Sequence, residues 1–66
     1  MTKKLRVLEM LEIAGQRGLT VHEMIMKGGG NDVRKYISEL RRAGEDITDN
    51  WEKKGREKWK RYYLVN

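Results

Sequence analysis

The sequence predicts an α+β fold in which three helices are followed by a C-terminal β-hairpin, all within a single domain spanning residues 1–66. Through the first 44 residues, apolar side chains recur at helical spacing in three separate segments. After residue 45 this spacing is lost, and aromatic and β-branched residues flank a polar turn that contains glycine. A chain of 66 residues can build only one small core, which is marginally stable without further support.

A first helix is predicted over residues 3–14. Its candidate core positions follow helical spacing: Leu5, Leu8 and Leu11, with Val7, Met10 and Ile13 close by. Thr2 is a suitable N-cap, because its hydroxyl can accept a hydrogen bond from a free N–H of the first turn. Gly15 is a suitable stop, and the polar residues Gln16 and Arg17 between two glycines predict a turn.

A short second helix is predicted over residues 21–27, after an extended residue at Leu19. Thr20, followed three residues later by Glu23, matches a capping box. In that arrangement the hydroxyl accepts from the N–H of Glu23 and the carboxylate accepts from the N–H of Thr20. The inner face is expected to consist of Val21, Met24 and Ile25, with Met26 partly exposed.

The stretch GGGNDVRKYISELRRAG, residues 28–44, predicts a loop and a third helix. Gly28 can end the second helix in the left-handed region, and Asn31 or Asp32 can cap the third. The third helix has one apolar stripe, formed by Val33, Tyr36, Ile37 and Leu40. Three glycines indicate a flexible turn, or a place where a phosphate approaches the backbone closely.

Two strands are predicted near residues 46–52 and 58–65, joined by the turn KKGR. Alternation places Tyr62 and Leu64 on one face, and we expect that face to pack on the helices. Trp51 and Trp59 are interpreted as core residues, as partners opposite each other across the hairpin, or as platforms for unpaired bases.

Composition argues against several classes of protein. The chain has no cysteine and one histidine, His22, whereas a structural zinc site needs about four such ligands. No nucleophile or carboxylate pair accompanies His22, so neither an enzyme, a cofactor nor a small-molecule substrate is expected. No apolar run approaches the ~20 residues of a membrane span, and the N-terminal segment is amphipathic. We therefore expect a cytoplasmic protein without a membrane partner.

The net charge of +5 is unevenly distributed along the chain. Residues 31–44 hold four basic and two acidic side chains, residues 45–50 hold three acidic ones, and residues 51–66 hold six basic and two acidic ones. Two basic blocks with an acidic spacer are compatible with a nucleic-acid footprint or with an ordinary solvated surface.

The third helix favours the first interpretation. At about 100° per residue, Asn31, Lys35, Ser38 and Arg42 lie nearly opposite the apolar stripe, with Arg34 and Arg41 on one flank. Asparagine and arginine are residue types that read base edges, and serine contacts bases or phosphates. The alternative is a helix face that is merely solvated.

The predicted hairpin turn is also basic, with Lys53, Lys54, Arg56 and Lys58 in or beside it. Phosphate oxygens would neutralise this cluster and release counterions. Lysines also protect an exposed edge strand from pairing with another chain, and this explanation applies best to Lys58 and Lys60.

The chain resembles the winged helix-turn-helix family, and among its members the small versions of phages and prophages. The resemblance is carried by RVLEMLEIAGQRGLTVHEM, by VRKYISELRRAGEDI and by a hairpin closing on YYL. It implies that the third helix enters the DNA major groove and that the hairpin, the wing of the family, touches the backbone or minor groove. The turn KGGGN departs from the family pattern, in which a tight turn carries an inward apolar residue.

The expected function is binding of double-stranded DNA, with sequence specificity, by a small transcriptional regulator or recombination accessory protein. Asn31, Arg34, Lys35 and Ser38 are then the base contacts, and Arg41, Arg42 and the hairpin hold phosphates. A single module covers little DNA, so a homodimer or a protein partner on DNA is expected. The alternatives are a protein-interaction adaptor that uses EDITDN and Met26, and an RNA or single-strand binder that uses the tryptophans.

Overall fold

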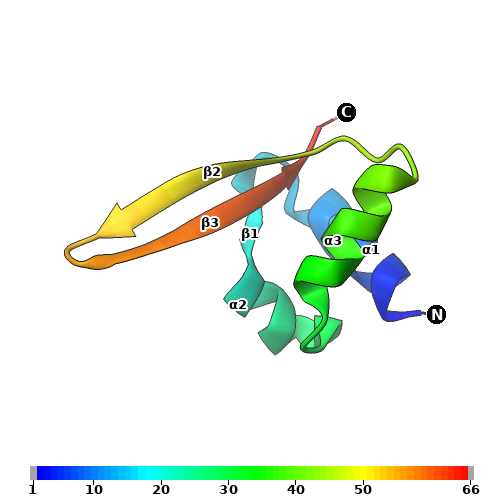
Figure 1. Cartoon of the computed structure of the whole chain (residues 1–66), viewed down its shortest axis with the longest axis horizontal. Helices are drawn as coiled ribbons and strands as arrows, with labels where there is room; N and C mark the ends of the chain where they lie inside the picture. Colours follow the sequence, from blue (N-terminus) through cyan, green and yellow to red (C-terminus); the bar gives the residue numbers. More distant parts are fainter. Residues whose placement is uncertain (1, 66) are drawn as a thin grey trace.

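Three helices and a three-stranded antiparallel sheet make up the computed structural model, which describes residues 2–65. The elements follow in the order α1 (Lys3–Ala14), a 3₁₀ turn η1 (Gly15–Arg17), β1 (Leu19–Thr20), α2 (Val21–Met24), a π-helical turn η2 (Ile25–Gly29), α3 (Val33–Arg42), β2 (Ile47–Lys54) and β3 (Glu57–Leu64). The predicted α+β class is confirmed. Figure 1 shows the helices on one side of the sheet and the far half of the β2–β3 hairpin reaching beyond them.

Two of the predicted helix starts are confirmed by their hydrogen bonds. The Leu5 N–H donates to the Thr2 hydroxyl at 3.2 Å. Before α2, the Glu23 N–H donates to the Thr20 hydroxyl at 3.1 Å and the Thr20 N–H donates to the Glu23 carboxylate at 3.0 Å, which completes the capping box. The third start differs, because Asp32 is the N-cap of α3 but its side chain accepts no hydrogen bond from the helix.

One core joins the helices to the sheet. Its buried members are Val7, Met10, Leu11, Leu19, Met24, Val33, Ile37, Leu40, Ile47 and Tyr62. The stripe predicted on α3 is confirmed, with Tyr36 half-buried at its edge, and Tyr62 faces the helices as expected. Every regular helix and strand contributes to this cluster, so the hairpin is fixed to the helices at its base and free at its tip.

The inner face of α1 is not centred where the sequence suggested. Val7, Met10 and Leu11 are buried, whereas Leu5 is 49% exposed and Ile13 is exposed as well. Six residues of an α-helix turn through about 600°, so Leu5 lies about 120° around the helix from Leu11. A run of leucines at intervals of three therefore drifts off the stripe that packs on α3 and β3.

The three glycines permit a close approach between η2 and α3. Gly28 and Gly30 have positive φ angles of 101° and 80°, which residues with a Cβ adopt rarely. Gly29 is buried, and a Cβ added there would lie 2.9 Å from the Met24 carbonyl oxygen and 3.0 Å from Val33 Cγ2. The backbone of Gly29 is thus packed between Met24 and Val33 with no room for a side chain.

The sheet has the strand order β1–β3–β2, with all neighbours antiparallel. The hairpin turns at Gly55 and Arg56. β2 therefore ends later, and β3 begins earlier, than the sequence predicted. This turn pairs Trp51 with Lys60 and Trp59 with Glu52. Of the three interpretations of the tryptophans, the one that pairs them across the hairpin is wrong, because an offset of one residue places them on opposite faces. Among residues 2–65, no helix has the length and apolar character needed to cross a membrane.

Candidate nucleic-acid interface

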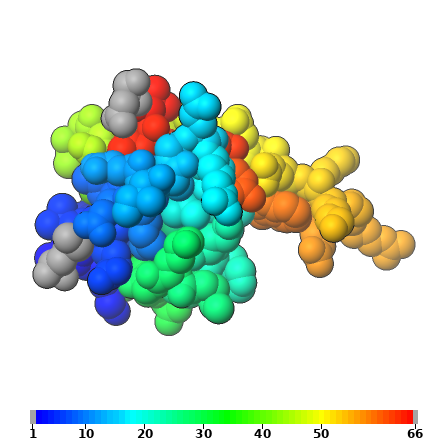
Figure 2. Space-filling model, turned by 180° about the vertical axis from the view of Figure 1, so that it is seen from behind, coloured from blue at the N-terminus to red at the C-terminus, as the bar shows by residue number. Residues whose placement is uncertain are grey.

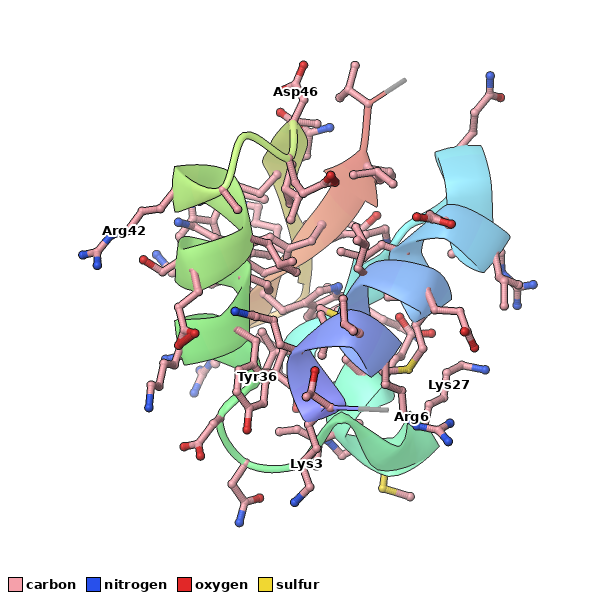
Figure 3. All side chains as sticks on the ribbon, turned by 90° about the vertical axis from the view of Figure 1, so that its right-hand side faces the viewer. Lys3, Arg6, Lys27, Tyr36, Arg42 and Asp46 are labelled. Atoms are coloured by element: carbon pink, nitrogen blue, oxygen red, sulfur yellow. The ribbon has the colours of Figure 1, made fainter. Side chains whose placement is uncertain are left out.

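The outward face of α3 is basic, as the sequence predicted. Arg34, Lys35, Ser38 and Arg42 are all exposed on this helix, and Figure 3 shows Arg42 pointing away from the helical body. None of the ion pairs found within residues 2–65 involves any of these side chains. Their charges and donors therefore face solvent, where a large anion can reach them.

Glu39 on α3 is turned toward α1. The Lys4 ammonium lies 3.6 Å from the Glu39 carboxylate, which partly neutralises the acid nearest to the basic face. Asn31 is exposed in the turn that leads into α3, close to the exposed acid Asp32. Asp32 thus offsets part of the positive charge that Arg34 and Lys35 bring to the first turn of the helix.

Arg41 is bound within the molecule, at odds with its predicted role as a phosphate contact. Its Nε donates to the Ile47 carbonyl oxygen at 3.0 Å, and its Nη2 donates to the Asp49 carboxylate at 2.9 Å. The guanidinium also lies 5.8 Å from the centre of the Tyr62 ring. The cause is the acidic segment EDITDN, which returns past the end of α3 and brings Asp49 to Arg41.

The tip of the hairpin carries the second basic group. Lys53, Lys54, Arg56 and Lys58 are exposed, on an arm that Figure 2 shows as a narrow projection from the body. Lys53 and Lys58 are directly opposite each other in the strand register. Like charges at opposite positions destabilise a hairpin, so an anion bound between them would relieve this repulsion.

Arg61 fixes the base of the arm to α2. Its Nε donates to the Glu52 carboxylate at 2.9 Å, and its Nη1 donates to the Glu23 carboxylate at 3.0 Å. The Trp59 indole N–H donates to the same Glu52 oxygen at 2.8 Å. One guanidinium therefore links β3, β2 and α2, and this link orients the arm relative to the helices.

The charged form of each group in this cluster is favoured. The pKa of Glu23 is lowered, mainly because the Thr20 N–H donates to its carboxylate. The pKa of Glu52 is lowered mainly by the hydrogen bond from Arg61, and the same bond raises the pKa of Arg61. The cluster consequently stays ionised throughout the neutral range.

An open groove of about 1030 Å³ runs between α2, the first turn of α3 and the hairpin. It is lined on the helix side by Val21, His22, Ile25 and Arg34, and on the hairpin side by Trp51, Lys58, Trp59 and Lys60, among others. The structure thus brings Arg34 and Lys58 to one groove, although 24 positions separate them in the sequence. Trp51 was expected to contact nucleic acid only in the alternative in which the tryptophans are platforms for unpaired bases, and Lys60 was interpreted as protection of an edge strand, because the placement of both depends on the strand register.

A further basic group was missed by the sequence analysis. Lys3 and Arg6 on α1 and Lys27 on η2 are exposed around the glycine segment, as Figure 3 shows. An added Cβ at Gly30 would lie 3.1 Å from Lys3 Cδ, so the Lys3 side chain packs over this glycine. The three residues come from two distant segments, and only the fold shows that they are neighbours.

Comparison with known proteins gives no assignment. No protein-family model matches this chain, no curated protein matches its sequence, and no solved structure matches its fold. We therefore infer the function from the geometry and charge of the residues described above.

Proposed function

We propose that this chain is a winged helix-turn-helix protein that binds double-stranded DNA in a sequence-specific manner. In this proposal α3 is the recognition helix, held in the major groove, and the β2–β3 hairpin is the wing, held against the adjacent backbone or minor groove. The observation that carries the proposal is the pair of exposed basic groups, on α3 and at the hairpin tip, whose members form no ion pair within the described residues.

The internal ion pairs favour this assignment. Those found within residues 2–65 use three of the 15 basic side chains, Lys4, Arg41 and Arg61, and four of the ten acidic ones. Acidic groups near α3 and the hairpin base are thereby neutralised, whereas the basic groups of the two surfaces are left for a partner. A duplex with a phosphate every ~1.7 Å along its axis is a partner with matching charge density.

The residue types on the two surfaces suggest which side chains contact bases and which contact phosphates. Arg34, Lys35 and Ser38 are placed to contact base edges, and Asn31 lies at the start of the helix beside them. Arg42 and the hairpin residues Lys53, Lys54, Arg56 and Lys58 are placed to contact phosphates. A chain of this kind would act as a small transcriptional regulator or recombination accessory protein, and not as an enzyme.

Affinity for duplex DNA, measured as a function of salt concentration, tests the proposal. If these five basic side chains contact phosphates, the logarithm of the association constant falls against the logarithm of salt concentration with a slope of about −4.5. Lys35→Glu should weaken binding at least tenfold, because it reverses a charge on the face of α3 that enters the DNA major groove. Arg17→Glu makes the same charge change on exposed η1, away from both surfaces, and should have little effect.

Chemical-shift changes in a titration with duplex DNA should be confined to α3 and the hairpin. A flat salt dependence, or equal losses for Lys35→Glu and Arg17→Glu, would contradict the proposal. The absence of any shift at physiological salt would instead favour an adaptor that binds protein through Met26, which is exposed on η2.

A further inference from the structure

The two tryptophans of the hairpin have different surroundings. Trp59 is half-buried, and its indole N–H is bonded to Glu52 at 2.8 Å, so it has a structural partner. Trp51, on β2, is 64% exposed and is not part of the core cluster. A large aromatic side chain in this position contributes little to the core, and its exposed ring is free to contact a ligand.

Trp51 lies among basic groups on its own face of the hairpin. Lys60 is directly opposite Trp51 in the strand register, and Lys58 is two residues closer to the tip. The Nζ atoms of Lys60 and Lys58 lie 5.1 and 5.6 Å from the centre of the indole ring. Both ammonium groups are thus held by the π electrons of one aromatic ring, and neither forms an ion pair within residues 2–65.

This face borders the groove between the hairpin and α2. Across the groove lie the apolar side chains of Val21 and Ile25, and Arg34 adds a third cation from α3. Two acids also line the groove, of which Glu23 is paired with Arg61 at 3.0 Å and Glu57 is exposed near the tip. The inner part of the groove therefore combines a flat aromatic surface, apolar walls and unpaired cations.

We propose that this groove binds an unpaired nucleotide, with its base stacked on Trp51 and its neighbouring phosphates held by Lys58 and Lys60. Every nucleobase has a flat face that can cover the indole ring, and each nucleotide brings an anionic phosphate within reach of the displaced ammonium groups. The inference rests on the proposed binding of DNA by α3 and the hairpin, and adds a preference for DNA with an unpaired strand beside the duplex.

Charge complementarity decides between a nucleic-acid strand and other occupants. An apolar peptide would leave three cations without partners, and an acidic peptide would supply charge but not the flat surface that covers an indole. A nucleic-acid strand alternates bases with phosphates, so it supplies both a flat surface for the indole and negative charge for the cations. Its repeat matches the spacing of adjacent side chains on one face of a β-strand.

Fluorescence of a single tryptophan gives a direct test. Trp59→Phe leaves Trp51 as the only tryptophan in the chain. This variant is titrated with a blunt duplex, with the same duplex carrying a three-nucleotide thymidine overhang, and with poly-glutamate. We expect the overhang to quench Trp51 and to raise affinity over the blunt duplex by roughly 5- to 150-fold, the range that stacking of one base supports.

The ratio of the two affinities separates stacking from general electrostatic attraction. In Trp51→Leu this ratio should fall to about one, whereas Trp51→Phe, which keeps an aromatic ring, should preserve part of the preference. Far-ultraviolet circular dichroism and amide spectra establish that each variant is folded. Equal affinities for blunt and overhang DNA with unquenched Trp51 overturn the inference and leave duplex binding intact.

Two other outcomes identify which proposal fails. Quenching by poly-glutamate without quenching by the overhang overturns base stacking and assigns the groove to an acidic polypeptide. Quenching and tight binding by a thymidine decamer, with no binding of blunt duplex, supports the stacking site and contradicts the duplex-binding function.

Discussion

Arg61 on β3 and Glu23 on α2 form an ion pair at 3.0 Å, although 38 positions separate them in the sequence. Glu23 is also half of the capping box that starts α2, and Arg61 also holds Glu52 on β2. The start of α2 and the base of the hairpin are therefore connected through the Glu23 carboxylate. This connection fixes the hairpin against α2, on one side of the groove that Trp51 lines.

Replacing the guanidinium should weaken the fold measurably. Arg61→Met keeps much of the side-chain volume but leaves two carboxylates near each other without a cation. We expect the free energy of unfolding to fall by about 1–2 kcal/mol, the range for charge-assisted hydrogen bonds that are partly open to solvent. Urea denaturation monitored by circular dichroism measures this change.

Lys53→Met is the matched control for that experiment, because it removes a positive charge from the exposed tip of the same hairpin. It should change the free energy of unfolding by less than about 0.5 kcal/mol. Equal losses for the two variants would mean that net charge, and not the link from Arg61 to Glu23, determines stability.

Stability should also depend on the ionisation of Glu23. Its pKa in the folded chain is lowered by the Thr20 N–H and by Arg61, so the folded state favours the carboxylate. The resulting stabilisation is complete above the unfolded value of about 4.3 and is lost as the pH falls through the lowered folded value. Because the side chain is 39% exposed, the effect should stay below about 1 kcal/mol.

Glu23→Gln isolates this effect, since glutamine can still accept the capping hydrogen bond but carries no charge. The wild-type chain should be more stable than the variant at neutral pH, and the difference should shrink as the pH falls below about 4.3 and the carboxylate becomes protonated in the folded chain. Denaturation curves at several pH values provide the measurement. For Glu12→Gln, on the exposed side of α1, the free energy of unfolding should depend on pH in the same way as for the wild type. A difference between wild type and Glu23→Gln that is as large at pH 3 as at neutral pH would contradict the assignment.

The glycine segment yields a prediction based on steric contact. Gly29→Ala places a Cβ 2.9 Å from the Met24 carbonyl oxygen, where the backbone must shift to make room. Such overpacking destabilises by about 1–3 kcal/mol. Gly55→Asn, in the open hairpin turn at a φ of 63°, is the control, because nothing lies within 4 Å and asparagine tolerates the left-handed region. If Gly29→Ala proves harmless by thermal denaturation, the approach of η2 to α3 is looser than the structure indicates.

The sequence predicted the elements better than it predicted their neighbours. Spacing and caps are local properties, so the three helices, the capping box at Thr20 and the buried stripe of α3 could be predicted from residues close together in the chain. Cross-strand partners depend on the turn, and a shift of one residue was enough to misplace Trp51 relative to Trp59.

The same limit applies to the candidate interface. Helical periodicity placed Lys35, Ser38 and Arg42 on the exposed face of α3, where the structure has them. It could not show that Arg41 would meet Asp49, because that contact depends on the path of the chain after α3. Nor could it place Arg34 and Lys58 in one groove, since their proximity follows from packing of the hairpin base on α2.

Adjacent arginines at the end of α3 should consequently behave differently. Arg42→Gln removes an exposed charge, so the slope of the salt dependence of DNA binding should become shallower by about 0.9, with stability unchanged. Arg41→Gln breaks the contacts to Ile47 and Asp49, so the free energy of unfolding should fall by about 1 kcal/mol, discounted because the side chain is 42% exposed. Its salt slope should match that of the wild type, because its guanidinium is already bound to Asp49. An equal reduction of the slope in both variants would show that Arg41 leaves Asp49 for a phosphate when DNA binds.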